Sequence, residues 1–348
     1  MRYRMIGTDP ATRREVSVLS LGAMLFGSVT DEATSFAILD RFVEAGGTFV
    51  DTSDNYAYWV NGDQGGQSEE LLGRWRRDRG IAAGAHLGGG QLPDGRELVI
   101  ATKVGARPLA PGTGFTDNPE GLSAKTLRES AERSRERMGV DRLDLFYAHI
   151  EDRETPLADT VAGFADLVEE GTVGLLGVSN HWSWRVERSR ALAAASGRPG
   201  YEVLQYQHSY LRRRADLAGR RSPDGDVGVA GGDLFDYLRA ESELTLVAYS
   251  PLLGGAYTRH SSDKPLGADF DHAGTAPRLA ALREVAAQTG ASVNQVVLSW
   301  MIGGELPVIP LVGASSVAQL DESLAAVDLD LTPRQRETLD HAVRPVEE

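Results

Sequence analysis

The chain has 348 residues, of which 41% are hydrophobic, and its 36 Lys and Arg against 50 Asp and Glu give a formal net charge of −14. An acidic chain without a long basic run offers little to a phosphate backbone, so we expect no nucleic-acid partner. The absence of cysteine excludes disulfides and Cys-ligated zinc. There is no signal-peptide pattern and no apolar run near the roughly 18 residues of a membrane span, so we expect a cytoplasmic protein with no membrane partner.

The first half of the chain alternates predicted strands and helices. Residues 1–18 are mixed and polar around a turn signal at 8–10, which fits a hairpin. Asp31 or Thr30 can cap the first helix, and Ser68 starts a later helix with a pattern like a capping box. The expected strands are 18–24, 48–50, 98–103 and 143–149, and the expected helices are 31–45, 68–75 and 123–138.

The second half continues the alternation. We interpret two segments, 57–96 and 211–232, as loop insertions, and the glycine run at 88–90 as mobile loop because no strand leads into it. The expected strands are 173–178, 203–207, 244–249 and 307–312. The expected helices are 157–170, 183–196, 233–241, 277–289, 292–303, 316–326 and 332–342.

Eight short apolar strands separated by helices are typical of a parallel sheet that helices cover. A closed barrel and an open doubly wound sheet both fit this order. Two observations favour the barrel: no G-x-G-x-x-G follows the first strand, and polar residues gather at the carboxyl ends of many strands. We therefore predict an α/β protein, a single-domain (β/α)8 TIM barrel over residues 1–348 with long βα loops and C-terminal helices.

The polar residues at the strand ends are the candidates for chemistry. Each has an ordinary structural explanation: an Asp can cap a loop, a Lys can lie on the surface, and a His can be a satisfied structural residue. In a barrel, however, they all point to one mouth, where an acid, a Lys, a Tyr and a His together indicate a site. These residues are Asp51, Tyr56, Lys103, His149, Ser179, Asn180, Gln205 and Tyr249.

Several of these segments, taken in order, resemble the aldo-keto reductase family. The match covers most of the chain and lies in the segments at 47–56 (GTFVDTSDNY), 100–103 (IATK), 143–149 (LDLFYAH), 177–180 (GVSN) and 249–252 (YSPL). The resemblance implies NAD(P)H-dependent reduction of a small-molecule carbonyl compound to an alcohol, with catalytic residues Asp51, Tyr56, Lys103 and His149 and no metal.

The implied chemistry has a physical basis. Hydride transfer to a carbonyl leaves an alkoxide that needs a proton and an oxyanion site. A free tyrosine has a pKa of about 10, and a cation such as Lys103 would lower it. We expect Tyr56 to be the general acid, Asp51 to hold Lys103 charged, and neutral His149 to donate a hydrogen bond that orients the substrate oxygen.

The resemblance also implies a cofactor site without a Rossmann unit. NADP(H) is favoured and NAD(H) is the alternative, because the stretch at 312–323 has no cation for a 2′-phosphate and offers only Ser315, Ser316 and Gln319. The implied cofactor residues are Met24, Asp51, Ser179, Asn180, Gln205, Tyr249, Ser250, Pro251, Leu252, Gly254, Gly313, Ser315, Ser316, Gln319 and Ser323.

The substrate pocket is expected among Met24, Tyr58, Trp59, Trp182 and the loops at 105–122 and 211–232. A sugar-like or secondary-metabolite carbonyl compound would suit such a mouth. Three alternatives remain: an NAD-dependent sugar or alcohol dehydrogenase, a nucleotide-sensing binding subunit, and a metal-dependent hydrolase. The last needs a His/Asp ligand cluster, whereas the seven histidines are scattered.

Overall fold

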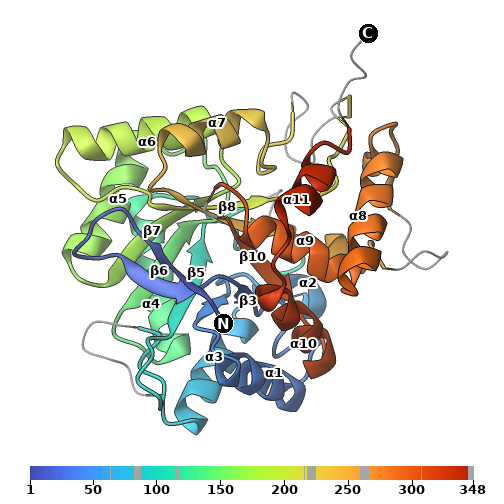
Figure 1. The fold of residues 1–348 in the computed structure, drawn as a ribbon. Coiled ribbons are helices and arrows are strands. Elements are labelled where there is room, and N and C mark those ends of the chain that lie inside the picture. The colour runs from blue at the N-terminus through green and yellow to red at the C-terminus, as the bar shows by residue number, and fades with distance from the viewer. Residues whose placement is uncertain are drawn as a thin grey trace.

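Eight parallel strands form a closed barrel at the centre of the molecule (Figure 1). A computed structural model describes residues 1–62, 64–81, 88–113, 118–214, 216–217, 225–258, 266–306 and 308–343. The last strand pairs with both the first and the seventh strand of the barrel, so the sheet has no free edge. This confirms the predicted (β/α)8 fold. In order around the barrel the strands are β10 (Val308–Gly313), β3 (Ser20–Gly22), β4 (Phe49–Asp51), β5 (Val99–Val104), β6 (Leu143–Ala148), β7 (Val173–Ser179), β8 (Val203–Gln207) and β9 (Thr245–Tyr249).

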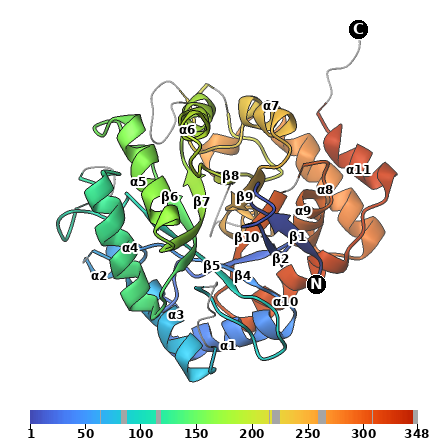
Figure 2. The ribbon, with the colours of Figure 1, turned by 90° about the vertical axis from the view of Figure 1, so that its left-hand side faces the viewer.

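Helices surround the barrel and cover its outer face (Figures 1 and 2). The helices of the described residues are α1 (Glu32–Glu44), α2 (Tyr58–Asn61), α3 (Gln67–Asp78), α4 (Ala124–Met138), α5 (Leu157–Glu169), α6 (Ser183–Ala195), α7 (Gly232–Ala240), α8 (Thr275–Thr289), α9 (Val293–Ile302), α10 (Val317–Ala325) and α11 (Pro333–Asp340), of which α2 lies at the carboxyl end of the barrel and not on its outer face. The short α2 was not predicted. Asp31 caps α1 as expected, by accepting from the Thr34 N–H at 2.9 Å.

The capping box predicted at Ser68 is wrong. Helix α3 begins after Gly66, whose φ of 113° is open to glycine at little cost, and no side chain caps it. The Ser68 hydroxyl instead donates to the carbonyl oxygen of Ala23 at 2.7 Å and lies 2.7 Å from the Thr52 hydroxyl. Ser68 therefore joins α3 to the strand ends of the barrel.

Residues 1–18 form the expected hairpin, with β1 (Tyr3–Ile6) antiparallel to β2 (Arg14–Ser17). Ile6 and Val16 are fully buried among the apolar side chains inside the barrel. The hairpin is tied to the amino ends of the strands, because the Ser17 N–H donates to the Thr48 hydroxyl at 2.9 Å. The hairpin therefore closes the amino end of the barrel.

The glycine run at 88–90 is buried and closely packed, so the prediction that it is a mobile loop is wrong. A Cβ on Gly88 would lie 1.7 Å from the Arg142 carbonyl oxygen, and one on Gly89 would lie 1.9 Å from that of Leu98. Both glycine N–H groups donate to the Asp144 carboxylate at 2.6 Å. Burial raises the pKa of Asp144 to about 6, even though these donors favour its charged form.

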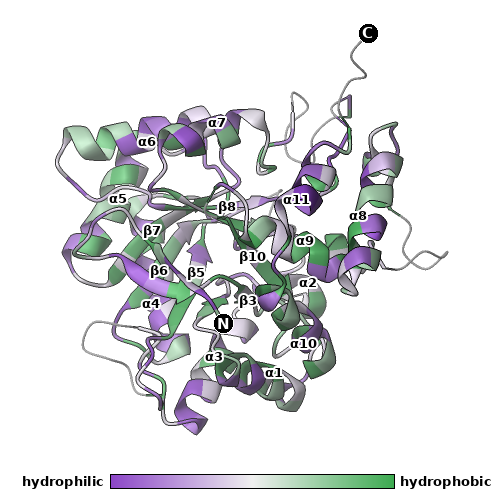
Figure 3. Cartoon of the chain, viewed as in Figure 1, coloured by the Kyte–Doolittle hydropathy of each residue, from purple (hydrophilic) through white to green (hydrophobic). Residues whose placement is uncertain are grey.

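The described parts of the predicted loop at 211–232 carry no helix or strand before α7, apart from an isolated bridge between Gln207 and Val229. Residues 215 and 218–224 of that prediction lie outside the described residues, as do 63 and 82–87 of the segment at 57–96. Hydrophobic residues dominate the barrel strands, while the helices carry both kinds (Figure 3). In the described part of the chain, no helix is long and apolar enough to cross a membrane.

Candidate active site

The residues that point into the barrel form rows that turn polar at the carboxyl ends of the strands. Side chains alternate along a strand, so every second residue faces the interior. Inside the barrel the rows are apolar. One step further they become polar: Phe49 is followed by Asp51, and Ala101 by Lys103. Four other polar residues also follow an apolar residue two positions earlier in the same row, namely His149, Ser179, Gln205 and Tyr249. The rows therefore deliver the predicted residues to one end of the barrel.

Lys103 joins the predicted catalytic residues. Its Nζ donates to Asp51 Oδ1, to the Thr52 carbonyl oxygen at 2.6 Å and to the Tyr56 hydroxyl at 3.0 Å. The other Asp51 oxygen accepts from Gln205 Nε2 at 2.7 Å. The side chains of Lys103 and Asp51 are 0% and 1% exposed. Burial alone lowers the pKa of Lys103, but Asp51 and Tyr56 outweigh it and hold that pKa above its ordinary value.

The Tyr56 phenol differs from the expectation in the direction of its pKa. Burial raises the pKa of Tyr56, the charge of Lys103 lowers it, and the net direction is upward. The sequence indicated the cation next to the phenol but not the depth of burial, and burial dominates. The phenol therefore keeps its proton at neutral pH, as a proton donor must.

His149 follows β6 and lies against Tyr56, with ring centroids 6.1 Å apart in an edge-to-face arrangement. The Ser53 hydroxyl lies 3.1 Å from His149 Nδ1 and donates to Asn55 Oδ1 at 2.9 Å. Ser53 and Asn55 stand inside the segment around Asp51 and Tyr56, but the sequence assigned them no role. Contact with His149, 96 residues away in sequence, is what distinguishes Ser53.

Hydrogen bonds connect the residues at the ends of β7, β8 and β9. Asn180 Nδ2 donates to the His149 carbonyl oxygen at 2.8 Å, and its Oδ1 accepts from the Tyr249 hydroxyl at 2.9 Å. The Ser179 hydroxyl donates to the Gln205 carbonyl oxygen at 2.7 Å. The neighbouring Gly177 makes room for the Tyr147 ring, because a Cβ there would lie 2.3 Å from it. These polar side chains are thus oriented before any ligand is considered.

A cavity of about 710 Å³ opens at this end of the barrel. Of the predicted catalytic residues, Lys103 lies behind the cavity wall, in contact with Tyr56, and the other three line it. Of the predicted cofactor residues, Ser316 does not line it and the rest do. Trp182 does not line it either, whereas Met24, Tyr58 and Trp59 do. Lining residues that the sequence did not single out include Leu25, Phe26, Asn55, Ala106, Asn294 and Glu322.

Left-handed backbone at non-glycine residues gathers around this cavity in the described part of the chain. Asn180 and Ser250 line the cavity and have φ values of 57° and 54°. Ala57, which follows Tyr56, has φ 76°, and Leu253 has φ 51°. Such backbone costs about 1–3 kcal/mol per residue and persists only where surrounding contacts enforce it. The strained positions therefore add to the case for a functional site here.

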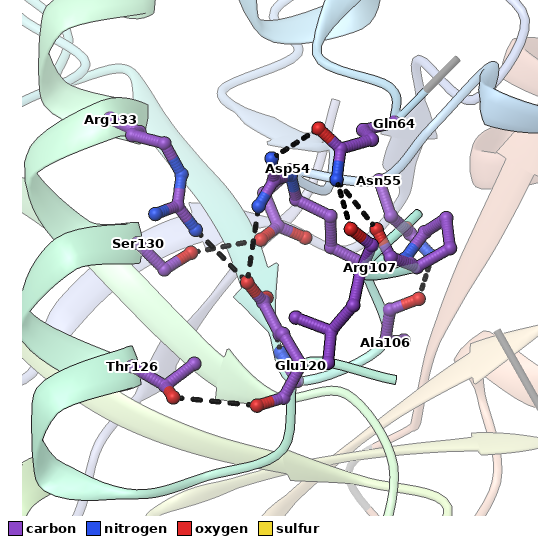
Figure 4. Close-up of polar contacts among 12 residues, drawn as sticks. Asp54, Asn55, Gln64, Ala106, Arg107, Glu120, Thr126, Ser130 and Arg133 are labelled. Carbon is purple, nitrogen blue, oxygen red and sulfur yellow. Dashed lines mark hydrogen bonds and ion pairs between the residues drawn. The ribbon is translucent and has the colours of Figure 1, made fainter. Parts of the chain in front are cut away.

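Polar contacts outside the cavity hold the loop that carries Tyr56 (Figure 4). The Ser130 hydroxyl donates to Asp54 Oδ2 at 2.8 Å. Burial and the nearby Glu120 raise the pKa of Asp54 well above its ordinary value. Arg107 donates to Gln64 Oε1 at 2.8 Å and lies 3.8 Å from Glu120. The loops after β4 and β5 are therefore tied to each other and to α4.

The start of α10 carries no positive charge. Ser316 caps this helix, while the Ser315 hydroxyl lies 3.0 Å from Gln319 Oε1. Arg41 reaches α10 from α1, but it pairs with Asp321 at 2.7 Å and does not line the cavity. Within the described ranges, no group of three or more His, Asp or Glu side chains is placed to hold a metal ion.

Comparisons with known proteins agree with this geometry. The sequence model of the Aldo/keto reductase family matches residues 18–344. An uncharacterised oxidoreductase of Bacillus subtilis, YrpG, is 28% identical over 95% of this chain and 92% of its own length. Norsolorinic acid reductase of Aspergillus flavus is 27% identical over 98% and 80%. The NADP(+) aryl-alcohol dehydrogenase of Phanerodontia chrysosporium is 27% identical over 98% and 86%.

Proposed function

Because the chain belongs to the Aldo/keto reductase family, we propose that it is an oxidoreductase that uses NAD(P)H to reduce an aldehyde or ketone to the alcohol. The observation that carries this proposal is the contact of Lys103 with both Asp51 and the Tyr56 hydroxyl beside the cavity. A half-buried phenol that keeps its proton, next to a fixed ammonium group, is suited to protonating an alkoxide.

Each residue has a distinct part in this proposal. The hydride would come from a reduced nicotinamide when one is bound. Tyr56 donates the proton that the new alkoxide needs, and Lys103 stabilises the phenolate that remains. Asp51 neutralises and orients Lys103 through a contact that excludes water. His149, at the cavity wall beside Tyr56, aligns the substrate oxygen.

The cavity suits a nicotinamide cofactor. Its volume falls within the roughly 300–1,000 Å³ of small-molecule sites. Ser179, Asn180 and Gln205 would hold the carboxamide, and Tyr249 would stack on the ring. We favour NADP(H), for which Ser315 and Gln319 would hydrogen-bond the 2′-phosphate, and one relative carries NADP(+) in its name. The absence of a cation at 312–323 keeps NAD(H) as the alternative.

The mouth of the cavity favours an aromatic carbonyl substrate over a sugar. Met24 and Trp59 line it, and their side chains are 44% and 47% exposed, so they offer apolar surface to a ligand. Trp59 contacts the Tyr56 ring edge-on, with centroids 6.3 Å apart, and lies 5.1 Å from the Tyr58 ring. Relatives named for norsolorinic acid and aryl alcohols are consistent with this choice.

The test is a screen of aldehydes, ketones and aldoses with NADPH and NADH, run on the natural chain and on Tyr56→Phe. We expect Tyr56→Phe to lose about 10²–10⁴-fold in kcat for carbonyl reduction and to keep its affinity for the cofactor. Tyr201→Phe is the control, because it removes the hydroxyl of another tyrosine, one that is buried and packs on Phe164 away from the cavity. Near-normal turnover by Tyr56→Phe would reject the assignment of the acid.

The same assay separates the alternatives. A dehydrogenase working towards oxidation would use NAD with alcohols or sugars, and the uncharged start of α10 is the feature that favours it. A nucleotide-sensing subunit would bind NADPH but oxidise it only slowly with every carbonyl compound tested.

A further inference from the structure

A chain of hydrogen bonds runs from a backbone carbonyl to the imidazole of His149. Asn55 Nδ2 donates to the Ala106 carbonyl oxygen at 3.0 Å, a contact drawn in Figure 4. The Ser53 hydroxyl donates to Asn55 Oδ1 at 2.9 Å, and the same hydroxyl oxygen lies 3.1 Å from His149 Nδ1. Ser53, Asn55 and Ala106 are all buried.

The chemistry of the groups sets the direction of every bond in this chain. A backbone carbonyl can only accept, so the Asn55 atom facing Ala106 must be the amide nitrogen. The other Asn55 atom is then the oxygen, which also only accepts, so the hydroxyl of Ser53 donates to it. A serine hydroxyl has one proton. Ser53 therefore has none left for His149 and can only accept from Nδ1.

We propose that Ser53 is a positioning residue that holds a proton on His149 Nδ1. The neutral ring then has its lone pair on Nε2, because the hydrogen bond at one ring nitrogen determines the state of the other. The arrangement is anchored at both ends. Turning the Asn55 amide over would bring two acceptors together at Ala106, and removing the Ser53 oxygen would leave the Nδ1–H of the half-buried His149 ring without this acceptor.

The consequence for chemistry rests on the proposed function. A neutral His149 of this form accepts the hydrogen of an alcohol hydroxyl at Nε2. It donates to a carbonyl oxygen only when Nε2 also carries a proton, in the imidazolium state. This gives the neutral ring a different role from the donor predicted from the sequence. Ser53, and Asn55 through Ser53, would set that role by determining which ring nitrogen carries the proton.

The proton can be located directly. The full chain, labelled with ¹⁵N in histidine, is examined by NMR at an alkaline pH where the ring is neutral, and the His149 signals are identified by their loss in His149→Gln. We expect the Nδ1–H form to exceed the Nε2–H form by about fivefold or more, the ratio that one ordinary hydrogen bond supports. A natural chain with its proton on Nε2 would overturn the proposal, and this measurement needs no variant of Ser53.

Ser53→Ala then tests the cause. Without the serine acceptor, the ratio of the two forms should fall by about fivefold. Ser20→Ala is the matched control, because it removes another buried hydroxyl, which donates to the Phe49 carbonyl oxygen at 3.2 Å, and it should leave the His149 signals unchanged. An unchanged ratio in a folded Ser53→Ala would also overturn the proposal. The test does not measure turnover. The proposal about Ser53 can therefore be overturned or supported whether or not the chain reduces a carbonyl compound.

Discussion

The ion pair between Lys103 and Asp51 makes a quantitative prediction for Lys103→Met. Methionine has a similar length but no charge, so the substitution leaves the Asp51 carboxylate buried without its ammonium partner, although it still accepts from Gln205. Breaking a buried pair from one side typically costs about 3–5 kcal/mol. The free energy of unfolding of a protein is about 5–15 kcal/mol, so this one change should remove a large share of it.

The pH dependence of that cost has a definite sign. Burial already raises the pKa of Asp51, and loss of the ammonium group raises it further. An acid whose folded pKa exceeds its unfolded value of about 3.9 destabilises the fold as the pH rises through that window. The variant should therefore be closest to the natural chain in acid, where Asp51 is protonated, and furthest from it at neutral pH.

Urea unfolding of four proteins measures the effect: the natural chain, Lys103→Met, Asp51→Asn and the double variant. The double variant leaves no buried charge, so its loss should fall short of the sum of the two single losses by about 2 kcal/mol. Lys125→Met is the control, because Lys125 is 84% exposed in its pair with Glu129 and should cost less than about 0.5 kcal/mol. A cost below about 1 kcal/mol for Lys103→Met, or strictly additive losses, would refute the reasoning.

Three further predictions concern the cofactor, the substrate and acid stability. Gln319→Arg should raise the ratio of kcat/KM for NADPH to that for NADH by about tenfold or more, because a charged donor adds about 1.5 kcal/mol at a phosphate. Steady-state kinetics with both cofactors measure this ratio. An unchanged ratio would mean that the 2′-phosphate does not bind beside residue 319. Trp59→Ala should raise KM for aromatic aldehydes by about fivefold and leave that for acetaldehyde nearly unchanged, because it removes one aromatic contact of about 1 kcal/mol beside Tyr56. Burial lowers the pKa of His208 to about 3. Below about pH 6.5 the unfolded chain therefore binds a proton at this residue while the folded chain does not, which destabilises the fold as the pH falls. His208→Phe should remove about 2 kcal/mol of the stability that the natural chain loses between roughly pH 6.5 and pH 5. Unfolding at both pH values measures this, with the exposed His341→Phe as control.

The sequence was sufficient for the barrel and for the residues at its mouth, because both follow from short-range pattern. An apolar strand that ends in Asp51 or Lys103 can be recognised within a few residues, and the parallel order of the strands brings those ends together. What the sequence lacked was spatial contact. It did not indicate that Ser53 meets His149, nor that Gly88 lies against Arg142. Nor did it indicate how deeply Tyr56 is buried, which determines the direction of its pKa.

The amino-terminal hairpin determines by which end of the barrel a ligand can enter and leave. Ile6 and Val16 fill the barrel from below, so in the part of the chain that the structure describes the fold is a cup with a blind end. The cavity above is shared by the candidate cofactor residues and the apolar side chains around Trp59. Under the proposed function, a substrate that reaches Tyr56 through this mouth would leave by the same opening after it has reacted. Aromatic contacts at Trp59 that bind the substrate more tightly would also bind the product more tightly, and they would slow its release.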